Sequence, residues 1–184
     1  EVVALVRKCV EQQMVCGTLY VDNYEETMEH VPDVNRSFVA AQIERNIMEY
    51  FAHVQGIVRK NSQDRYFIAV KIKDLAGMQR TKFEILDKIR DIDTYCDRSI
   101  TISMGIGVGE DYQKVSEYAR LAIELALGSG GHQCVLKEGE RNYFYGGKTR
   151  QVEKNSRVKA RITSLALREI MAGKQSVVVM GHNV

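Results

Sequence analysis

The sequence predicts an α+β fold of ferredoxin-like type, in which helices flank a sheet that contains a hairpin. Three observations lead to this prediction. Residues 100–108 alternate strictly between bulky and small side chains, as a strand does. Residues 56–60 and 65–72 are strand-like segments separated by the turn-forming residues 61–64, which indicates the hairpin. Apolar residues recur at helical spacing before and after these segments.

The amino-terminal half is predicted to hold a strand and a long helix. Residues 14–23 form the strand, because valine and leucine side chains lie there among small or aromatic ones. Pro32 suits the first turn of a helix, which we expect to end near Ala52. The apolar positions of this helix are Val39, Ile43, Ile47, Tyr50 and Phe51.

The second half is predicted to alternate helices and strands. A helix carries Phe83, Leu86, Ile89 and Ile92, and after the strand at residues 100–108 a second helix carries Val115, Ala119, Ala122 and Ala126. Glycines at residues 128–131 end that helix, and short strands follow near residues 134–136 and 143–145. Small residues on one face of the strand at 100–108 allow a helix or a ligand to approach closely.

Composition excludes several classes of protein. The 184 residues include 26 Lys plus Arg against 24 Asp plus Glu, and this net charge of +2 predicts no nucleic-acid partner. A hydrophobic content of 45% is typical of a globular domain rather than a disordered chain. No apolar stretch approaches the roughly 20 residues of a membrane span. The four cysteines and four histidines are dispersed, which argues against a zinc site.

The domain organisation follows from changes of character along the chain. Because the chain begins at Glu1 rather than Met, we expect it to be a piece of a longer protein, with residues 1–13 ending an upstream helix. Residues 14–147 form the main domain. Residues 148–175 are predicted to be a basic connector helix, and residues 176–184 to begin a truncated domain with a buried strand.

The connector has seven basic and two acidic residues between positions 148 and 169, together with an apolar stripe. It is either a solvated connector that packs one face on a neighbour or a binding face for phosphates or anionic lipid. We favour the connector. The stripe consists of Val158, Ile162, Leu165 and Ile170.

Two carboxylates are candidates for a nucleotide or metal site. Asp22 lies near the end of the first strand and Asp64 lies in the hairpin turn, so the predicted fold places them at one sheet edge. Paired carboxylates at strand ends can hold two Mg²⁺ ions for attack on phosphorus. On spacing alone, the better interpretation is that Asp22 caps a turn and Asp64 suits a hairpin.

Several motifs together resemble the GGDEF family, the palm domain of diguanylate cyclases, over residues 14–136. Tyr20-Val21-Asp22-Asn23-Tyr24 stands where the family has Asp-Ile-Asp-x-Phe, and Ser62-Gln63-Asp64-Arg65-Tyr66 where it has Gly-Gly-Asp-Glu-Phe. Residues 100–105 are similar to the Thr-x-Ser-x-Gly strand, and residues 119–130 to the final helix. The resemblance implies a nucleotide-cyclase palm sheet flanked by helices.

The departures from the family pattern imply a degenerate domain without diguanylate cyclase activity. The first metal-binding Asp is Tyr20, and Ser62-Gln63 replaces the glycines that let a triphosphate approach the hairpin. Met28 stands at the guanine-reading Asn and Leu127 at the phosphate-binding Lys. The product-inhibition motif, which would fall at residues 53–56, is absent.

Residues 144–150, with Val158-Lys159-Ala160-Arg161, resemble the family of GdpP-type cyclic-di-AMP phosphodiesterases. The resemblance implies two membrane helices, a PAS domain, this degenerate GGDEF domain and a DHH phosphoesterase domain that uses manganese. Val179-Met180-Gly181-His182 is similar to the opening strand of that phosphoesterase domain, and His182 would be its first metal ligand.

The expected function is therefore that of a regulatory domain in a membrane-anchored hydrolase that converts cyclic-di-AMP to linear pApA. We expect this region to be cytoplasmic and homodimeric, to lack the catalytic centre, and to have its nucleotide site, with Mg-ATP as the ligand, at Asp22 and Asp64. One alternative is an ATP-binding or dimerisation module with weak ATPase activity. A less favoured alternative is an active diguanylate cyclase.

Overall fold

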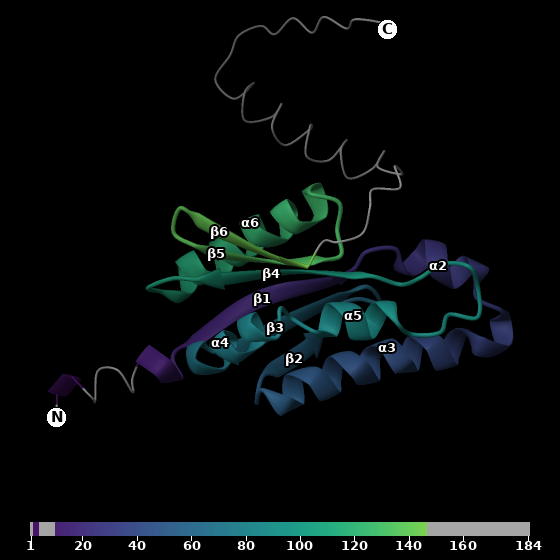
Figure 1. The fold of residues 1–184 in the computed structure, drawn as a ribbon, viewed down its shortest axis with the longest axis horizontal. Coiled ribbons are helices and arrows are strands. Elements are labelled where there is room, and N and C mark those ends of the chain that lie inside the picture. The colour runs from purple at the N-terminus through teal and green to yellow at the C-terminus, as the bar shows by residue number, and fades with distance from the viewer. Residues whose placement is uncertain (1, 4–9, 147–184) are drawn as a thin grey trace, which may run out of the picture. The chain divides into compact units, whose positions relative to one another are not determined.

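A six-stranded sheet flanked by helices forms the domain (Figure 1). The structure, a computed structural model, describes residues 2–3 and 10–146. Most of the predicted upstream helix and all of the predicted connector, strand and metal ligand in residues 148–184 lie outside the described residues. Among those described, no helix combines the length and the apolar character needed to cross a membrane.

The strand order is β2-β3-β1-β4-β5-β6, and all neighbours are antiparallel except the parallel pair β4 and β5. This arrangement confirms the predicted α+β palm and its hairpin, formed by β2 and β3. The strands are β1 (Met14–Val21), β2 (Ile57–Lys60), β3 (Arg65–Lys71), β4 (Ile102–Val108), β5 (Gln133–Glu138) and β6 (Arg141–Gly146).

Five helices connect these strands. The predicted long helix and the predicted last helix are present as α3 and α6, whereas the helix expected around residues 83–92 is the short α5. The pattern missed two helices, α2 and α4. The helices are α2 (Tyr24–His30), α3 (Asp33–His53), α4 (Ile72–Arg80), α5 (Ile85–Arg90) and α6 (Tyr112–Gly128).

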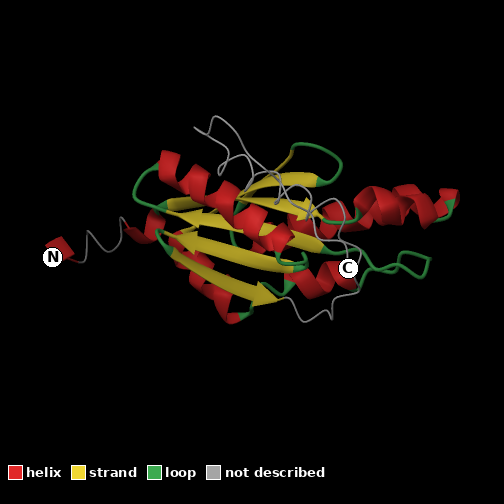
Figure 2. Cartoon of the chain, turned by 90° about the horizontal axis from the view of Figure 1, so that it is seen from above, coloured by secondary structure: helices red, strands yellow, loops and turns green. Residues whose placement is uncertain are grey.

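The helices cover the two faces of the sheet unequally. Helices α3, α4 and α5 pack on one face around the main core, in which Leu19, Phe51 and Ile102 are fully buried. Helix α6 lies across β1, β4 and β5 on the other face, as Figure 2 shows from above. There Ala122, Ile123, Ala126 and Val135 form a second, smaller cluster.

The two faces of β4 explain how α6 reaches the sheet. Ile102, Met104 and Ile106 are buried in the main core, as the alternation predicts. On the opposite face, a Cβ atom at Gly105 would lie 2.2 Å from the backbone nitrogen of Ile123. A Cβ atom at Gly107 would lie 2.0 Å from a carbonyl oxygen of α6. The small face of β4 therefore accommodates a helix, one of the two occupants that its sequence allows.

Replacing Gly105 by Ala tests this close approach. The added methyl group has to displace backbone atoms of α6, so we expect the free energy of unfolding to fall by ~1–3 kcal/mol or more. Gly77→Ala in α4 is the control, because the nearest atom to its Cβ would be 4.0 Å away. That change should stabilise the helix by about 0.4–1 kcal/mol. Chemical denaturation measures both, and equal stability of the two variants would contradict the packing described.

Candidate functional site

The carboxyl end of β1 and the amino end of the antiparallel strand β3 lie side by side at one end of the sheet. Both candidate carboxylates, Asp22 and Asp64, are found there. The backbone nitrogen of Val21 donates to the carbonyl oxygen of Asp64 at 2.8 Å. The backbone nitrogen of Asp22 donates to the carbonyl oxygen of Thr101, which precedes β4, at 2.9 Å. The two segments are therefore neighbours, as expected, but the carboxylate side chains of Asp22 and Asp64 have different partners.

The Asp22 carboxylate stabilises the turn between α6 and β5 by hydrogen bonding. Its Oδ2 atom accepts hydrogen bonds from the Thr101 hydroxyl at 2.9 Å and from the backbone nitrogen of His132 at 3.0 Å. Gly131 passes so close that a Cβ atom there would lie 3.0 Å from the same oxygen. Surrounding protein atoms desolvate the carboxyl and raise its pKa, against the effect of the hydrogen bonds from the His132 backbone and the Thr101 hydroxyl. These contacts match the turn-capping interpretation of Asp22.

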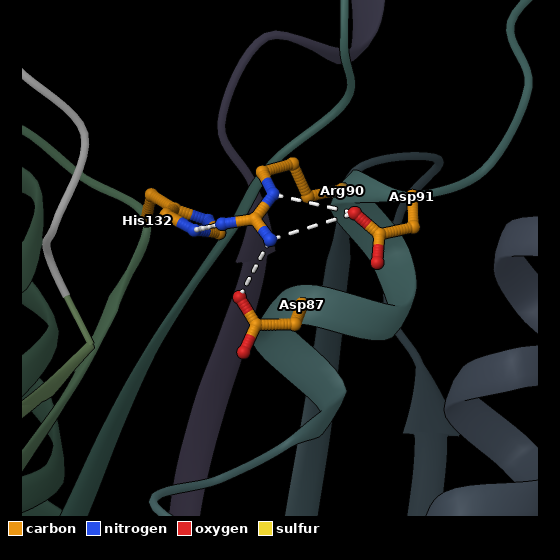
Figure 3. A network of polar contacts seen from close by, with 4 residues as sticks. All are labelled: Asp87, Arg90, Asp91 and His132. Atoms are coloured by element: carbon orange, nitrogen blue, oxygen red, sulfur yellow. Dashed lines mark hydrogen bonds and ion pairs between the residues drawn. The ribbon is translucent and has the colours of Figure 1, made fainter.

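His132 connects this turn to α5 through a network of charged residues (Figure 3). Nη1 of Arg90 lies 3.3 Å from Nε2 of His132. The same guanidinium is paired with Asp87 at 2.9 Å and with Asp91 at 3.4 Å. Since a guanidinium only donates hydrogen bonds, Nε2 has to accept. Burial, and then the positive charge of Arg90, lower the pKa of His132, which favours the neutral ring.

No pattern in the sequence predicts this network. His132 adopts a φ of +51°, a conformation unusual for a residue other than glycine, and it follows two positive-φ glycines. Its Nδ1 atom is buried and has no hydrogen-bond partner among the described residues. The side chain is therefore held by the turn and by Arg90, two constraints that come from tertiary structure.

Asp64 belongs to a separate, more exposed group of side chains. Its Oδ1 atom accepts a hydrogen bond from the Ser62 hydroxyl at 2.6 Å, and its Oδ2 atom lies 3.6 Å from Nε of Arg65. The guanidinium carbon of Arg65 lies 4.8 Å from the centre of the Tyr20 ring, a cation–π contact. Tyr20 in turn packs against the second, smaller cluster, which α6 and β5 form. Arg65 is therefore fixed between an aromatic ring and a carboxylate.

These residues do not fit a divalent metal ion. Mg²⁺ requires oxygen ligands in a nearly octahedral arrangement, whereas a guanidinium here lies beside Asp64 and over Tyr20. Asp22 already accepts hydrogen bonds from the Thr101 hydroxyl and the His132 backbone. Within residues 10–146, no three His, Cys, Asp or Glu side chains are grouped so that they could hold a metal.

The other positions singled out by the family pattern are used for packing. Met28 is half-buried against the main core, and Leu127 packs on the cluster that includes Ile123. Neither side chain can donate a hydrogen bond to a base or carry charge to a phosphate. His182, the predicted manganese ligand, lies outside the described residues, and the roles of Asp22 and Asp64 in nucleotide binding stay predictions.

Comparison with known proteins agrees with the sequence motifs. The family model described as "Cyclic-di-AMP phosphodiesterase GdpP-like, GGDEF domain" matches residues 19–144. The cyclic-di-AMP phosphodiesterase GdpP of Geobacillus thermodenitrificans is 34% identical over 97% of this chain and 27% of its own length. The cyclic-di-AMP phosphodiesterase PdeA of Listeria monocytogenes is 33% identical over 97% and 27%. The chain thus spans about a quarter of the length of these relatives.

Solved structures confirm the fold. The active GGEEF domain of a diguanylate cyclase from Vibrio cholerae superposes with a TM-score of 0.57 at 12% identity, covering 75% of this chain and 92% of that domain. The GGDEF domain of DgcB from Caulobacter crescentus, solved with c-di-GMP, gives a TM-score of 0.54 at 16% identity over 72% and 85%. At these identities the likeness establishes the palm fold alone.

The lowered pKa of His132 predicts a dependence of stability on pH. The unfolded chain binds a proton at this residue near the ordinary pKa of about 6.5, whereas the folded chain binds it only at lower pH. The contribution of the neutral ring is therefore present above about pH 6.5 and is lost as the pH falls. His132→Asn, which tolerates a positive φ, should weaken the dependence of the unfolding free energy on pH between about 7 and 5.

His53→Asn is the matched control, because His53 is exposed at the end of α3. Denaturant titrations at several pH values measure both variants. If His132→Asn and His53→Asn leave the same pH dependence as the unchanged chain, the assignment of a neutral, Arg90-bound ring is wrong.

Proposed function

The chain belongs to the family of GdpP-like GGDEF domains of cyclic-di-AMP phosphodiesterases, and on this premise we propose that it is the regulatory domain of such an enzyme. The parent protein would hydrolyse cyclic-di-AMP to linear pApA in a manganese-dependent DHH domain that begins near His182. It would be anchored in the membrane through upstream helices, with this region homodimeric and in the cytoplasm.

The observation that supports a regulatory rather than a cyclase role is the stacking of Arg65 on Tyr20. A cyclase palm needs carboxylates and metal ions where phosphoryl transfer takes place. Here the Arg65 guanidinium and the Tyr20 phenol ring occupy these positions. Met28 and Leu127 pack against the two hydrophobic clusters. The palm fold is retained while the groups that would perform cyclase chemistry are replaced.

A regulatory domain also needs a connection between its ligand site and the chain that leads to the next domain. Gln133, which follows His132, is paired with Gly146 at the end of β6. A Cβ atom at Gly146 would lie 3.2 Å from the carbonyl oxygen of His132. The Asp22–His132 contact is therefore next to the point where the chain leaves the described domain. A ligand that moved the end of β1 would therefore also displace the His132 turn and the end of β6 that is paired with it.

The chain on its own should have neither cyclase nor phosphodiesterase activity. With GTP and Mg²⁺ or Mn²⁺ it should form no c-di-GMP, because Arg65 and Tyr20 exclude the required metal ligands. With cyclic-di-AMP and Mn²⁺ it should release no pApA, whereas the full-length protein should. Chromatography of the reaction products measures all three reactions. Clear formation of c-di-GMP by the chain, or a full-length protein that leaves cyclic-di-AMP intact, would refute the proposal.

Asp22→Asn should disturb regulation in the full-length protein. The amide keeps the size of the side chain but lacks the charge that holds the Thr101 hydroxyl and the His132 backbone. We expect the rate of cyclic-di-AMP hydrolysis at saturating Mn²⁺ to change by about tenfold in either direction, corresponding to ~1.4 kcal/mol. Asp33→Asn, at the exposed start of α3, is the matched control. Equal rates for all three proteins would contradict the proposed connection.

A further inference from the structure

Helix α3 carries a second stripe of side chains, on the side that faces away from the main core. Its inner stripe is buried in that core and includes Val39, Ile43 and Ile47. The other stripe is exposed, and its members follow one another at alternating steps of four and three residues. All of them are apolar except one arginine. We call this set the outer stripe: Val34, Phe38, Ala41, Arg45, Met48 and Ala52.

The spacing of the outer stripe is that of a coiled-coil seam. Apolar residues that recur every 3.5 residues on average keep one side of a helix turned toward a partner helix. Val34 is 88% exposed and Phe38 is 52% exposed, so large apolar surfaces face the solvent. Single exposed apolar residues are common on proteins, whereas a contiguous set of them marks an interaction surface. The outer stripe therefore suits another helix as its partner.

An aromatic pair strengthens one end of the outer stripe. The ring of Tyr95, in the loop between α5 and β4, lies 6.5 Å from the ring of Phe38 at an interplanar angle of 57°. The Tyr95 backbone has a φ of +56°, which is uncommon for a residue other than glycine. Tyr95 limits the movement of the Phe38 ring and adds aromatic area beside it. Aromatic side chains that are ordered before binding contribute strongly to protein interfaces.

A second copy of this chain offers a helix that complements the outer stripe. In an antiparallel pair whose twofold axis is level with Ile43, Phe38 faces Met48 of the partner subunit. A methionine sulfur against an aromatic ring is a favourable contact. In the same pair Val34 faces Ala52 of the partner subunit at each end of the seam. Every member of the stripe thus meets another member, as a twofold interface requires.

The charge of Arg45 favours the antiparallel direction over the parallel one. In a parallel pair, Arg45 would face Arg45 of the partner subunit in the middle of the seam, and like charges repel. In the antiparallel pair it faces Ala41 of the partner subunit, whose small side chain leaves room for the aliphatic part of the arginine. Nε of Arg45 lies 2.6 Å from Oε1 of Glu49 on the same helix, so the cation keeps its counter-ion.

We propose that the outer stripe is the seam of a homodimer in which α3 packs antiparallel on α3 of a second copy. The contact lies on the face of the sheet opposite to α6, so the end of β1 and its turn stay uncovered. The inference deepens the homodimeric state included in the proposed function, on which it rests for its biological role. Its test measures association of this chain and not hydrolysis of cyclic-di-AMP, so that either proposal can fail alone.

Sedimentation equilibrium of the chain over a range of concentrations is the first part of the test. We expect a reversible equilibrium between monomer and dimer. Phe38→Glu should raise the dissociation constant by about thirtyfold or more, because the twofold axis places the charge in the seam twice. Tyr112→Glu, which introduces the same charge at an exposed aromatic residue in α6, is the matched control and should leave the constant unchanged.

Circular dichroism confirms that both variants are folded. A chain that is monomeric at every concentration would overturn the inference. A dimer that Phe38→Glu weakens no more than Tyr112→Glu does would also overturn it, because the interface would then lie elsewhere.

A zinc clamp tests the antiparallel direction. Val34 and Ala52 are 18 residues apart, ~27 Å along one helix, so histidines at both positions cannot share a metal ion within one chain. In the double variant Val34→His with Ala52→His, the proposed pairing brings the two positions together across the seam. Zn²⁺ should therefore strengthen its dimerisation by about tenfold or more. Ala52→His alone should show no such effect, since it faces Val34 of the partner subunit. Equal strengthening of the single and double variants by Zn²⁺ would indicate a parallel pair and refute the proposal.

Discussion

The contact between α6 and β4 determines the arrangement of the whole candidate site. Gly105 and Gly107 let the helix backbone approach the strand to a distance that no larger residue permits. This approach buries the small cluster of Ala122, Ala126 and Val135 and leaves Tyr20 packed at its edge. It also sets where α6 ends, and hence where the turn carrying His132 meets Asp22. The helix thus positions both an aromatic ring and a backbone donor at the end of β1.

The two candidate carboxylates serve different purposes as a result. Asp22 is committed to the turn after α6 and holds it by hydrogen bonds from Thr101 and His132. Asp64 faces outward and orients Arg65, whose other contact is Tyr20. The charge at this end of the sheet is therefore partly supplied by a fixed guanidinium. Such a site is suited to bind an anion and unsuited to hold the cation that the phosphoryl chemistry of a cyclase requires.

Much of the fold could be predicted from the sequence, because its strands and longer helices show the periodic spacing of apolar residues that is typical of each. The alternation in residues 100–108 identified both the strand and its small face, and the turn residues 61–64 identified the hairpin. Helix α2 left no such pattern, since only Thr27 among its residues is buried. Helix α4 begins directly after β3, and its two buried residues, Leu75 and Met78, are too few to reveal a helical period.

The chemistry of the site was harder to predict than the fold. Family motifs located Tyr20 and Asp64, and their neighbourhood at one sheet edge follows from the topology. The stacking of Arg65 on Tyr20 depends on strand register, which pairs these two residues directly across β3 and β1. The link from Asp22 to Arg90 depends on a positive φ at His132, a conformation that local sequence seldom specifies for this residue type. Both features arise from tertiary contacts.

At the end of β1, a guanidinium stands in place of a metal ion. Paramagnetic broadening of backbone amide NMR signals by Mn²⁺ distinguishes the two arrangements, because the effect is confined to residues near a bound ion. We expect no localised broadening around Tyr20 and Asp64 in the unchanged chain. We expect such broadening to appear in the double variant Tyr20→Asp with Arg65→Glu, which restores carboxylates at both positions. Saturable, localised broadening at Asp64 in the unchanged chain would show that a metal ion binds there and that the guanidinium does not replace it.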